Sequence, residues 1–253
     1  DNRGPFRVSL GSLLIFVWIT GTTALLVPVC AGLIEIRRIR RHARPEPTLE
    51  RLAWAAARGA GLRRRFEVLT HDGVVGPITF GIRRPVIILP TGAVQWAEDD
   101  VNRALLHELE HVRRGDWLTH CVARVVCAVY WFHPMVWIAW RELVFEAERA
   151  CDDAVVARAD AEGYADQLLS LAHRLSARRQ PQLGMANRRD LARRVIAVLN
   201  ETQMRGRAGR ACLTGVVAAA VLLTGLLTPL HWVALAAPPE PAPEFPPESA
   251  PAP

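Results

Sequence analysis

Two long apolar segments limit what this chain can fold into more than any other feature of its 253 residues. No side chain is charged between Leu10 and Ile34. About 20 helical residues, each with a rise of about 1.5 Å, cross the ~30 Å hydrocarbon core of a bilayer. We therefore predict that residues 8–36 form a transmembrane helix. Residues 211–237 are predicted to form a second one, because His231 is their only ionisable side chain.

The arginines near these two segments predict an orientation. Arginine-rich short flanks stay on the cytoplasmic side of a membrane. Five arginines follow the first segment, and three precede the second: Arg37, Arg38, Arg40, Arg41 and Arg44, then Arg205, Arg207 and Arg210. No Arg or Lys follows residue 237. Residues 37–210 are therefore expected to be a cytoplasmic domain, and the Pro-rich tail 238–253 an extracytoplasmic linker. The first segment is too long for a signal peptide, and its arginines lie on the wrong side.

Composition agrees with a membrane protein. Half of the chain (51%) is apolar, and the mean hydropathy is +0.12. All 31 basic residues, which give a net charge of +6, are arginines. Because arginines flank both segments on the same side, we interpret the positive charge as a topology signal, and we expect no direct binding of nucleic acid. The five cysteines are scattered without a CxxC pair, which favours buried thiols.

A third apolar stretch, residues 117–140, is not predicted to span the membrane. It contains Arg124 and the pair His133-Pro134. Proline lacks the N–H that an inner helical turn needs, so Pro134 should break the helix. We expect a buried or interfacial pair of helices here.

The cytoplasmic region is predicted to be mainly α-helical with a small antiparallel β meander. Short runs of β-branched and aromatic residues, separated by Gly and Pro, predict strands at 66–70, 77–80 and 86–89. Helical patterns precede and follow these strands. They predict helices at 48–65, from 97 onward, and at about 117–132, 135–159, 161–178 and 188–203.

The helix that starts near residue 97 contains the sequence His107-Glu108-Leu109-Glu110-His111. Histidines four residues apart lie on one helical face and can bind one zinc ion. Glu108 can then accept a proton from water at the remaining coordination position. The alternative is a polar, solvated helix face. The spacing favours zinc, with His107 and His111 as ligands and Glu108 as the catalytic base.

A catalytic zinc usually needs a third protein ligand. The helix after Pro134 offers three candidates, and the spacing favours Glu148 over Glu146 and Glu142. Asp152 follows Glu148 by one turn and could orient a ligand histidine. A charged, solvated face is again the alternative. If Glu148 joins the histidines, the stretch 117–140 cannot cross the bilayer once, because the ligands would then lie on opposite sides. For Asp116, a role behind the metal and a surface role are equal options.

These residues belong to longer blocks that resemble the membrane metallopeptidases of the beta-lactam sensor-transducer (BlaR/MecR antirepressor) type. The resemblance covers about residues 76–156. Its blocks are GPITFG at 76–81, RPVIILP at 84–90, HELEHVRRGD at 107–116, YWFHPMVW at 130–137 and ERACDDAV at 148–155. Several blocks in this order are far more specific than HExxH alone. The family's usual Asn-Pro is His133-Pro134 here, which should not affect the zinc.

The resemblance implies a gluzincin-like, zincin-fold peptidase in a cytoplasmic loop between the last two membrane helices of a multi-pass bacterial inner-membrane protein. It implies zinc as cofactor, His107, His111 and Glu148 as ligands, and Glu108 as base. The substrate would be a cytoplasmic protein, such as a transcriptional repressor or the chain itself. We expect a catalytic segment of a longer receptor. No penicillin-binding domain and no Ser-x-x-Lys motif are present in these residues, so beta-lactam sensing is not carried over.

Two other functions stay open at this point. One is a non-proteolytic signalling scaffold in which zinc is structural or absent. The other is a transporter or channel, which is weak because two spans give no polar path through the membrane. The bilayer is one expected partner, and a homodimer is neither required nor excluded by the sequence.

Overall fold

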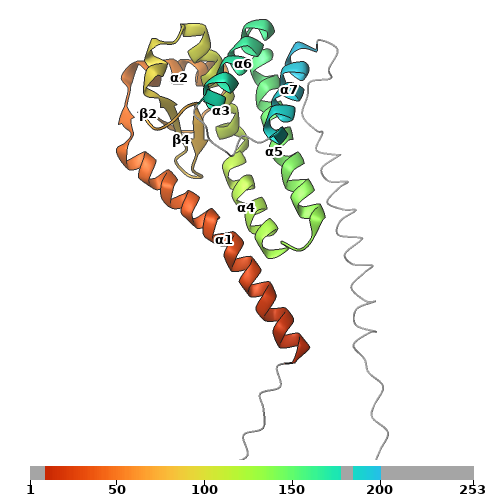
Figure 1. Cartoon of the computed structure of the whole chain (residues 1–253). Coiled ribbons are helices and arrows are strands. Elements are labelled where there is room, and N and C mark those ends of the chain that lie inside the picture. The colour runs from red at the N-terminus through yellow and green to blue at the C-terminus, as the bar shows by residue number, and fades with distance from the viewer. Residues whose placement is uncertain (1–8, 178–184, 201–253) are drawn as a thin grey trace, which may run out of the picture. The chain divides into compact units, whose positions relative to one another are not determined.

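A computed structural model describes residues 9–177 and 185–200 of the chain (Figure 1). The predicted second span 211–237 and the tail 238–253 lie outside these residues. Helix α1 (Leu10–His42) begins at Ser9, whose hydroxyl accepts a hydrogen bond from the Ser12 amide. It is the one described helix that is long and apolar enough to cross a membrane. The helix continues past the predicted residue 36 through its arginines, and ends just before Pro45, whose ring disfavours helical backbone.

The four-stranded sheet is mixed, so the predicted antiparallel meander is wrong. Its strands are β1 (Arg44–Pro45), β2 (Glu67–His71), β3 (Ile78–Phe80) and β4 (Val86–Pro90), in the order β1-β2-β4-β3. Strand β2 runs parallel to β4, with Val68 beside Ile87, and β3 is antiparallel to β4. A meander would place β3 in the centre.

The burial of β4 explains this topology. Residues Val86–Leu89 are all fully buried. A strand with both faces covered reads as a continuous apolar run and takes a central position. The segment between β2 and β3 places Val74 against the sheet, next to Val86 and Ile88, and carries the chain past β4. Strand β3 is therefore an edge of the described sheet.

The described part of the chain contains seven α-helices. After α1 they are α2 (Pro47–Gly59), α3 (Glu98–Arg114), α4 (Asp116–Val129), α5 (Pro134–Val156), α6 (Ala161–Ala177) and α7 (Met185–Leu199), and a 3₁₀ helix covers Thr91–Gln95. Every helix predicted within the described residues is found, with ends displaced by a few residues. Pro47 and Pro134 each occupy a first turn, where a missing N–H costs nothing. The stretch 117–140 is broken into two helices before Pro134, as predicted.

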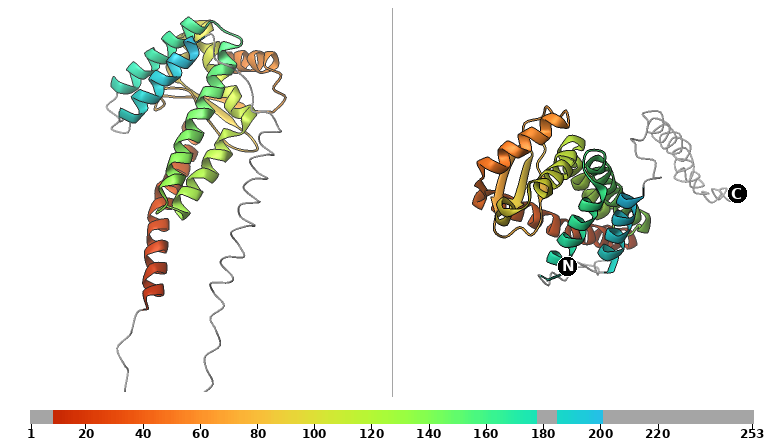
Figure 2. Two further views of the ribbon diagram at one scale, coloured as in Figure 1. Left: turned by 90° about the vertical axis from the view of Figure 1, so that its right-hand side faces the viewer. Right: turned by 90° about the horizontal axis from the view of Figure 1, so that it is seen from above.

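Alternate residues of β4 face two different cores. Ile87 and Leu89 pack with α2 and α3, in a cluster that includes Leu105 and Leu109. Val86 and Ile88 face the other side, where the end of α1 and Trp117 cover them. A third cluster joins α5, α6 and α7. Helix α3 lies between the sheet and these helices, so its side chains can meet residues from both (Figures 1 and 2).

Candidate metal centre

Helix α3 presents His107 and His111 side by side. Leu105, Leu109 and Val112 fix the face of α3 that packs on the sheet, so the two histidines lie on a neighbouring face. Their ring centroids are 4.9 Å apart and the rings are nearly perpendicular. Glu98, Asp99 and Asp100 stabilise the positive end of the α3 dipole. Gly115, with a φ of +74°, ends the helix in the left-handed conformation.

Each histidine is held through its Nδ1 atom. His111 Nδ1 lies 2.8 Å from Asp116 Oδ2. His107 Nδ1 lies 2.9 Å from the Tyr164 hydroxyl and 3.3 Å from Asp152 Oδ1. The Tyr164 hydroxyl donates to Asp152 over 2.7 Å, so its oxygen can accept a hydrogen bond from the His107 Nδ1–H group. This hydrogen-bond network assigns the proton of both neutral rings to Nδ1 and leaves a lone pair on each Nε2.

The two Nε2 atoms converge on the Glu148 carboxylate, one on each oxygen. His107 Nε2 lies 3.5 Å from Oε2, and His111 Nε2 lies 3.5 Å from Oε1. Ligand atoms about 2.1 Å from a tetrahedral zinc would be about 3.4 Å from one another. Two imidazole lone pairs and a carboxylate at this spacing fit zinc, so the donor set and its geometry suit the ion that the sequence predicts.

The structure separates Glu148 from the other two candidates on α5. Glu142 and Glu146 are exposed, and Glu146 pairs with Arg149 on the helix surface. Glu148 instead faces the histidines, with its side chain 28% exposed. Asp152, one turn further along α5, is buried and reaches His107. The predicted set His107, His111, Glu148 and Asp152 is thus brought together in one place.

Cys151 is a second potential ligand near the histidines. Its thiol, His107 and His111 offer three ligand atoms within 4.8 Å of one another. The Cys151 sulfur lies 3.4 Å from His111 Nδ1, which already meets Asp116. The thiol is therefore behind the His111 ring, away from the Nε2 atoms. Burial raises its pKa to about 11, which disfavours the thiolate that zinc needs. We consider Glu148 the better third donor.

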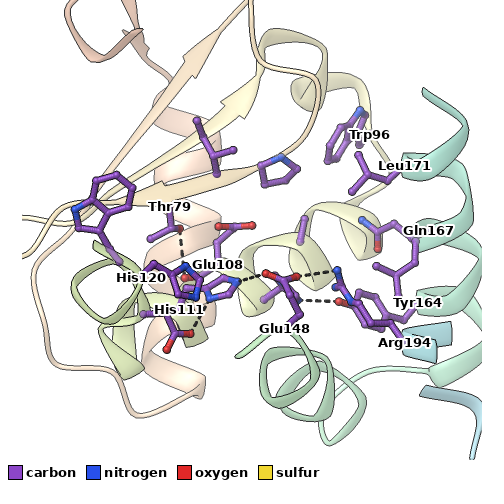
Figure 3. A pocket seen from close by; sticks show the side chains of 17 residues that line it. Thr79, Trp96, Glu108, His111, His120, Glu148, Tyr164, Gln167, Leu171 and Arg194 are labelled. Carbon is purple, nitrogen blue, oxygen red and sulfur yellow. Dashed lines mark hydrogen bonds and ion pairs between the residues drawn. The ribbon is translucent and has the colours of Figure 1, made fainter. Parts of the chain in front are cut away.

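Arg194 of α7 joins the site from the far side of Glu148. Its guanidinium donates to both Asp152 oxygens at 2.7 Å, and Nη1 lies 2.7 Å from Glu148 Oε2. One arginine therefore fixes both Glu148 and Asp152 of α5. Figure 3 shows Arg194 and Tyr164 on one side of Glu148, and His111 on the other.

The charges of the site act on one another strongly. Burial alone would lower the pKa values of His107 and His111, but hydrogen bonds to carboxylates outweigh it and raise both. Burial alone would raise the pKa of Glu148, but the two histidines and Arg194 lower it well below the ordinary value. Burial would also raise the pKa of Asp152, but Arg194 and His107 lower it to about 2. Anionic surroundings that favour a proton on imidazole also favour a divalent cation there.

Glu108 lies beside this cluster in the wall of a cavity of about 300 Å³. Its side chain is largely buried, at 7% exposure. The cavity also borders Pro77, Ile78 and Thr79, which belong to β3 or immediately precede it. Figure 3 shows Thr79 and Glu108 close together at one end of the cavity. A group bound between the histidines would thus face both a carboxylate and an edge strand.

Sequence reasoning missed two members of this site. Tyr164 and Arg194 lie 57 and 42 residues from the partners that they contact, His107 and Asp152. Neither belongs to a recognisable motif, and the pair Arg193-Arg194 alone resembles a solvated helix face. For Asp116, which the sequence left open, the structure shows the contact with His111 and not a surface position.

Comparison with known proteins gives a consistent result. The model of the BlaR1 peptidase M56 family matches residues 7–198. The chain is 29% identical over 199 residues to "Regulatory protein BlaR1" of Bacillus licheniformis, covering 76% of this chain and 33% of that protein. It is 23% identical over 158 residues to the "Methicillin resistance mecR1 protein" of Staphylococcus aureus and of Staphylococcus epidermidis. That match covers 61% of this chain and 27% of each relative, so the chain spans a third or less of their length.

Proposed function

Since the chain belongs to the BlaR1 peptidase M56 family, we propose that it is a membrane-bound zinc endopeptidase that cleaves a cytoplasmic protein. The observation that carries this proposal is the convergence of two histidine Nε2 atoms on one carboxylate, beside the buried Glu108. His107, His111 and Glu148 would hold the zinc. When bound, zinc would supply Lewis-acid polarisation of the scissile carbonyl and lower the pKa of a coordinated water from about 16 to about 7.

The remaining chemistry is assigned to residues of the chain. Glu108 would accept a proton from the attacking water and deliver it to the leaving amine, which makes it a general base and then a general acid. Both ligand histidines would be kept in the tautomer that presents Nε2 to the metal. Asp116 would hold His111, and Asp152 together with Tyr164 would hold His107. Mutation of residues that hydrogen-bond to metal ligands typically lowers metal affinity or activity about 10- to 100-fold.

Strand β3 is the proposed binding site for the substrate backbone. Within the described sheet β3 pairs only with β4, so its other edge can accept an added strand. Ile78 and Thr79 of this strand border the cavity that contains Glu108. An extended peptide hydrogen-bonded to β3 would therefore pass over the metal centre. This arrangement suits an endopeptidase, because the bound peptide can continue at both ends.

The proposal places α1 across the membrane and the metal centre in the cytoplasm. The uncharged stretch of α1 is long enough to span, and arginines fill its last turns. Residues 211–237 would form a second span, with the tail outside, in a multi-pass protein of the bacterial inner membrane. We infer that the substrate is a cytoplasmic protein, and a transcriptional repressor is the first candidate. The main alternative is a signalling scaffold that does not cleave protein.

A peptide-library assay separates these two functions. The full chain is reconstituted in lipid vesicles with zinc and incubated with a library of proteome-derived peptides, and new termini are identified by mass spectrometry. Glu108→Gln should retain zinc and lose cleavage, by about 10²-fold or more, because a general base contributes that much. Glu146→Gln, an exposed glutamate on α5, is the matched control and should cleave normally. Equal cleavage by wild type and Glu108→Gln would exclude this peptidase mechanism.

A further inference from the structure

The tip of the α4–α5 helix pair has an unusually apolar surface. From Val125 to Trp140 the sequence contains no Asp, Glu, Lys or Arg. Large apolar or aromatic side chains along α4, the connecting turn and the start of α5 are 40–59% exposed: Leu118, Val122, Val125, Val126, Tyr130, Phe132, Met135 and Ile138. A soluble domain rarely exposes so many large apolar side chains in one place.

This tip lies beside the uncharged part of α1. The Trp18 indole donates a 2.9 Å hydrogen bond to the Val129 carbonyl at the end of α4. Trp131 of the turn lies directly against Gly21, where a Cβ atom would come within 2.5 Å of the indole ring. Gly21 is near the middle of the uncharged stretch 10–34. Figures 1 and 2 show α4 approaching α1 at the tip of the helix pair, with α5 packed against α4.

Several backbone groups of the tip are hydrogen-bonded within the protein, as a lipid environment would require. A helix end leaves carbonyl and amide groups without helical partners, and in hydrocarbon no water can satisfy them. Here the Val129 carbonyl accepts from Trp18, and the Trp131 carbonyl accepts from the Trp137 indole over 3.0 Å. The Tyr130 carbonyl accepts from the His133 amide.

His133 closes the other side of the turn. Its ring Nδ1 accepts from the Met135 amide at the start of α5, and its carbonyl accepts from the Val136 amide. Both contacts satisfy groups that water would otherwise serve at a helix N-terminus. Indole and imidazole side chains therefore form hydrogen bonds with backbone groups of this turn that water would bind in an exposed loop.

We propose that the α4–α5 tip is a re-entrant hairpin that inserts into the hydrocarbon core of the bilayer next to α1, with lipid acyl chains as its partner. The inference rests on the proposed membrane placement of α1. Arg124 and Arg141 would mark the level of the membrane surface, and Arg124 lies over the Trp140 ring at 4.9 Å. Arginine and tryptophan are common at this level of a bilayer.

The hairpin would set the height of the metal centre above the membrane. Glu148 follows Arg141 by seven helical residues, which is about 10 Å along α5. A substrate must therefore present its scissile segment close to the membrane surface. This selects juxtamembrane segments, including those of the chain itself, and soluble proteins whose cleavage site extends from the folded body.

Photocrosslinking to lipid tests the hairpin directly. Benzoylphenylalanine replaces Phe132 at the tip in the full chain, reconstituted in vesicles of phosphatidylethanolamine and phosphatidylglycerol. Phe16, 67% exposed on α1, is the positive control, and Ile82, 48% exposed at the turn before β4, is the negative control. Met135 provides a second tip position in case the Phe132 variant does not fold. After irradiation, intact-mass measurement detects adducts with one phospholipid.

The four positions distinguish the failure of this inference from the failure of its premise. We expect lipid adducts at Phe132 and Phe16 at comparable yield, and at least tenfold less at Ile82. Adducts at Phe16 without adducts at either tip position would overturn the hairpin alone. Crosslinks from the tip to a second copy, or to another segment of the chain, without lipid would also overturn it. The absence of lipid adducts at Phe16 would overturn the membrane placement of α1, and the hairpin proposal with it.

Discussion

Replacing Arg194 by methionine would test whether α7 is held in place by the acidic residues behind the metal. The substitution keeps an apolar stem of similar length and removes the guanidinium. Asp152 then loses two 2.7 Å hydrogen bonds and Glu148 loses one contact of the same length. Both acidic residues are on α5, whereas Arg194 is on α7, so the substitution weakens the contact between these helices.

The expected magnitude follows from burial. The side chains of Arg194 and Asp152 are only 17% and 3% exposed, so solvent screens their interaction weakly. Removing one partner of such a pair costs about 3–5 kcal/mol. Asp152 keeps its hydrogen bond from Tyr164, so we expect the lower end, about 3 kcal/mol. At about 1.4 kcal/mol for each factor of ten, α7 should open roughly a hundredfold more often.

Hydrogen exchange measured by mass spectrometry reports this opening. Peptides that cover residues 190–199 should exchange roughly a hundredfold faster in Arg194→Met than in wild type. The matched control is Asp190→Asn on the same helix, whose side chain is 39% exposed and lies 4.0 Å from Arg193. An exposed pair of this kind contributes about 0–1 kcal/mol, so the control should change exchange by less than about fivefold.

A double-mutant cycle identifies the cause. In an Asp152→Asn background the buried negative charge is absent, so adding Arg194→Met should accelerate exchange by less than about tenfold. The reasoning is refuted if Arg194→Met exchanges within about threefold of wild type, since that is below 1 kcal/mol. It is also refuted if the effect of Arg194→Met is unchanged by Asp152→Asn.

Two further substitutions test the support of α3. Asp116→Asn should weaken zinc binding about 10- to 100-fold in a chelator competition, because His111 loses its charged partner, whereas the exposed Asp99→Asn should bind as wild type does. Gly115→Ala should lower stability by about 1–2 kcal/mol, because φ is +74° there although an added Cβ would meet no atom within 4 Å. Gly92→Ala, equally open and without a positive φ, is its control, and equal melting temperatures for both variants would contradict the backbone explanation.

The parts of this fold that depend on local sequence could be predicted. Helical periodicity located all the described helices, and Pro134 located the break between α4 and α5. The HExxH spacing placed both histidines and Glu108 on one helix. The sheet topology could not be predicted in this way, because the pairing of β2 with β4 joins strands that are not adjacent in the chain. The continuous apolar run of β4 was the available sign of a central strand.

The choice of the third ligand also depends on tertiary packing as well as on local sequence. Glu146 and Glu148 are two residues apart, so they point about 200° apart around α5. Spacing on α5 favoured Glu148, but which glutamate faces α3 also depends on how the two helices pack. The apolar residues Phe145, Cys151 and Val155 settle the rotation of α5 by their burial. Arg194 and Tyr164 were beyond sequence reasoning because no local pattern links them to the histidines.

The most direct test of the account is zinc K-edge X-ray absorption on the purified full chain. The account predicts one tightly bound zinc with nitrogen and oxygen neighbours only, at about 2.0–2.2 Å, and a clear imidazole signature from two histidines. Glu148→Gln should reduce the zinc content, and Glu146→Gln should leave it unchanged. A sulfur neighbour at about 2.3 Å would replace Glu148 by Cys151 as the third ligand. A chain that binds no zinc while both histidines are intact would contradict the peptidase account itself.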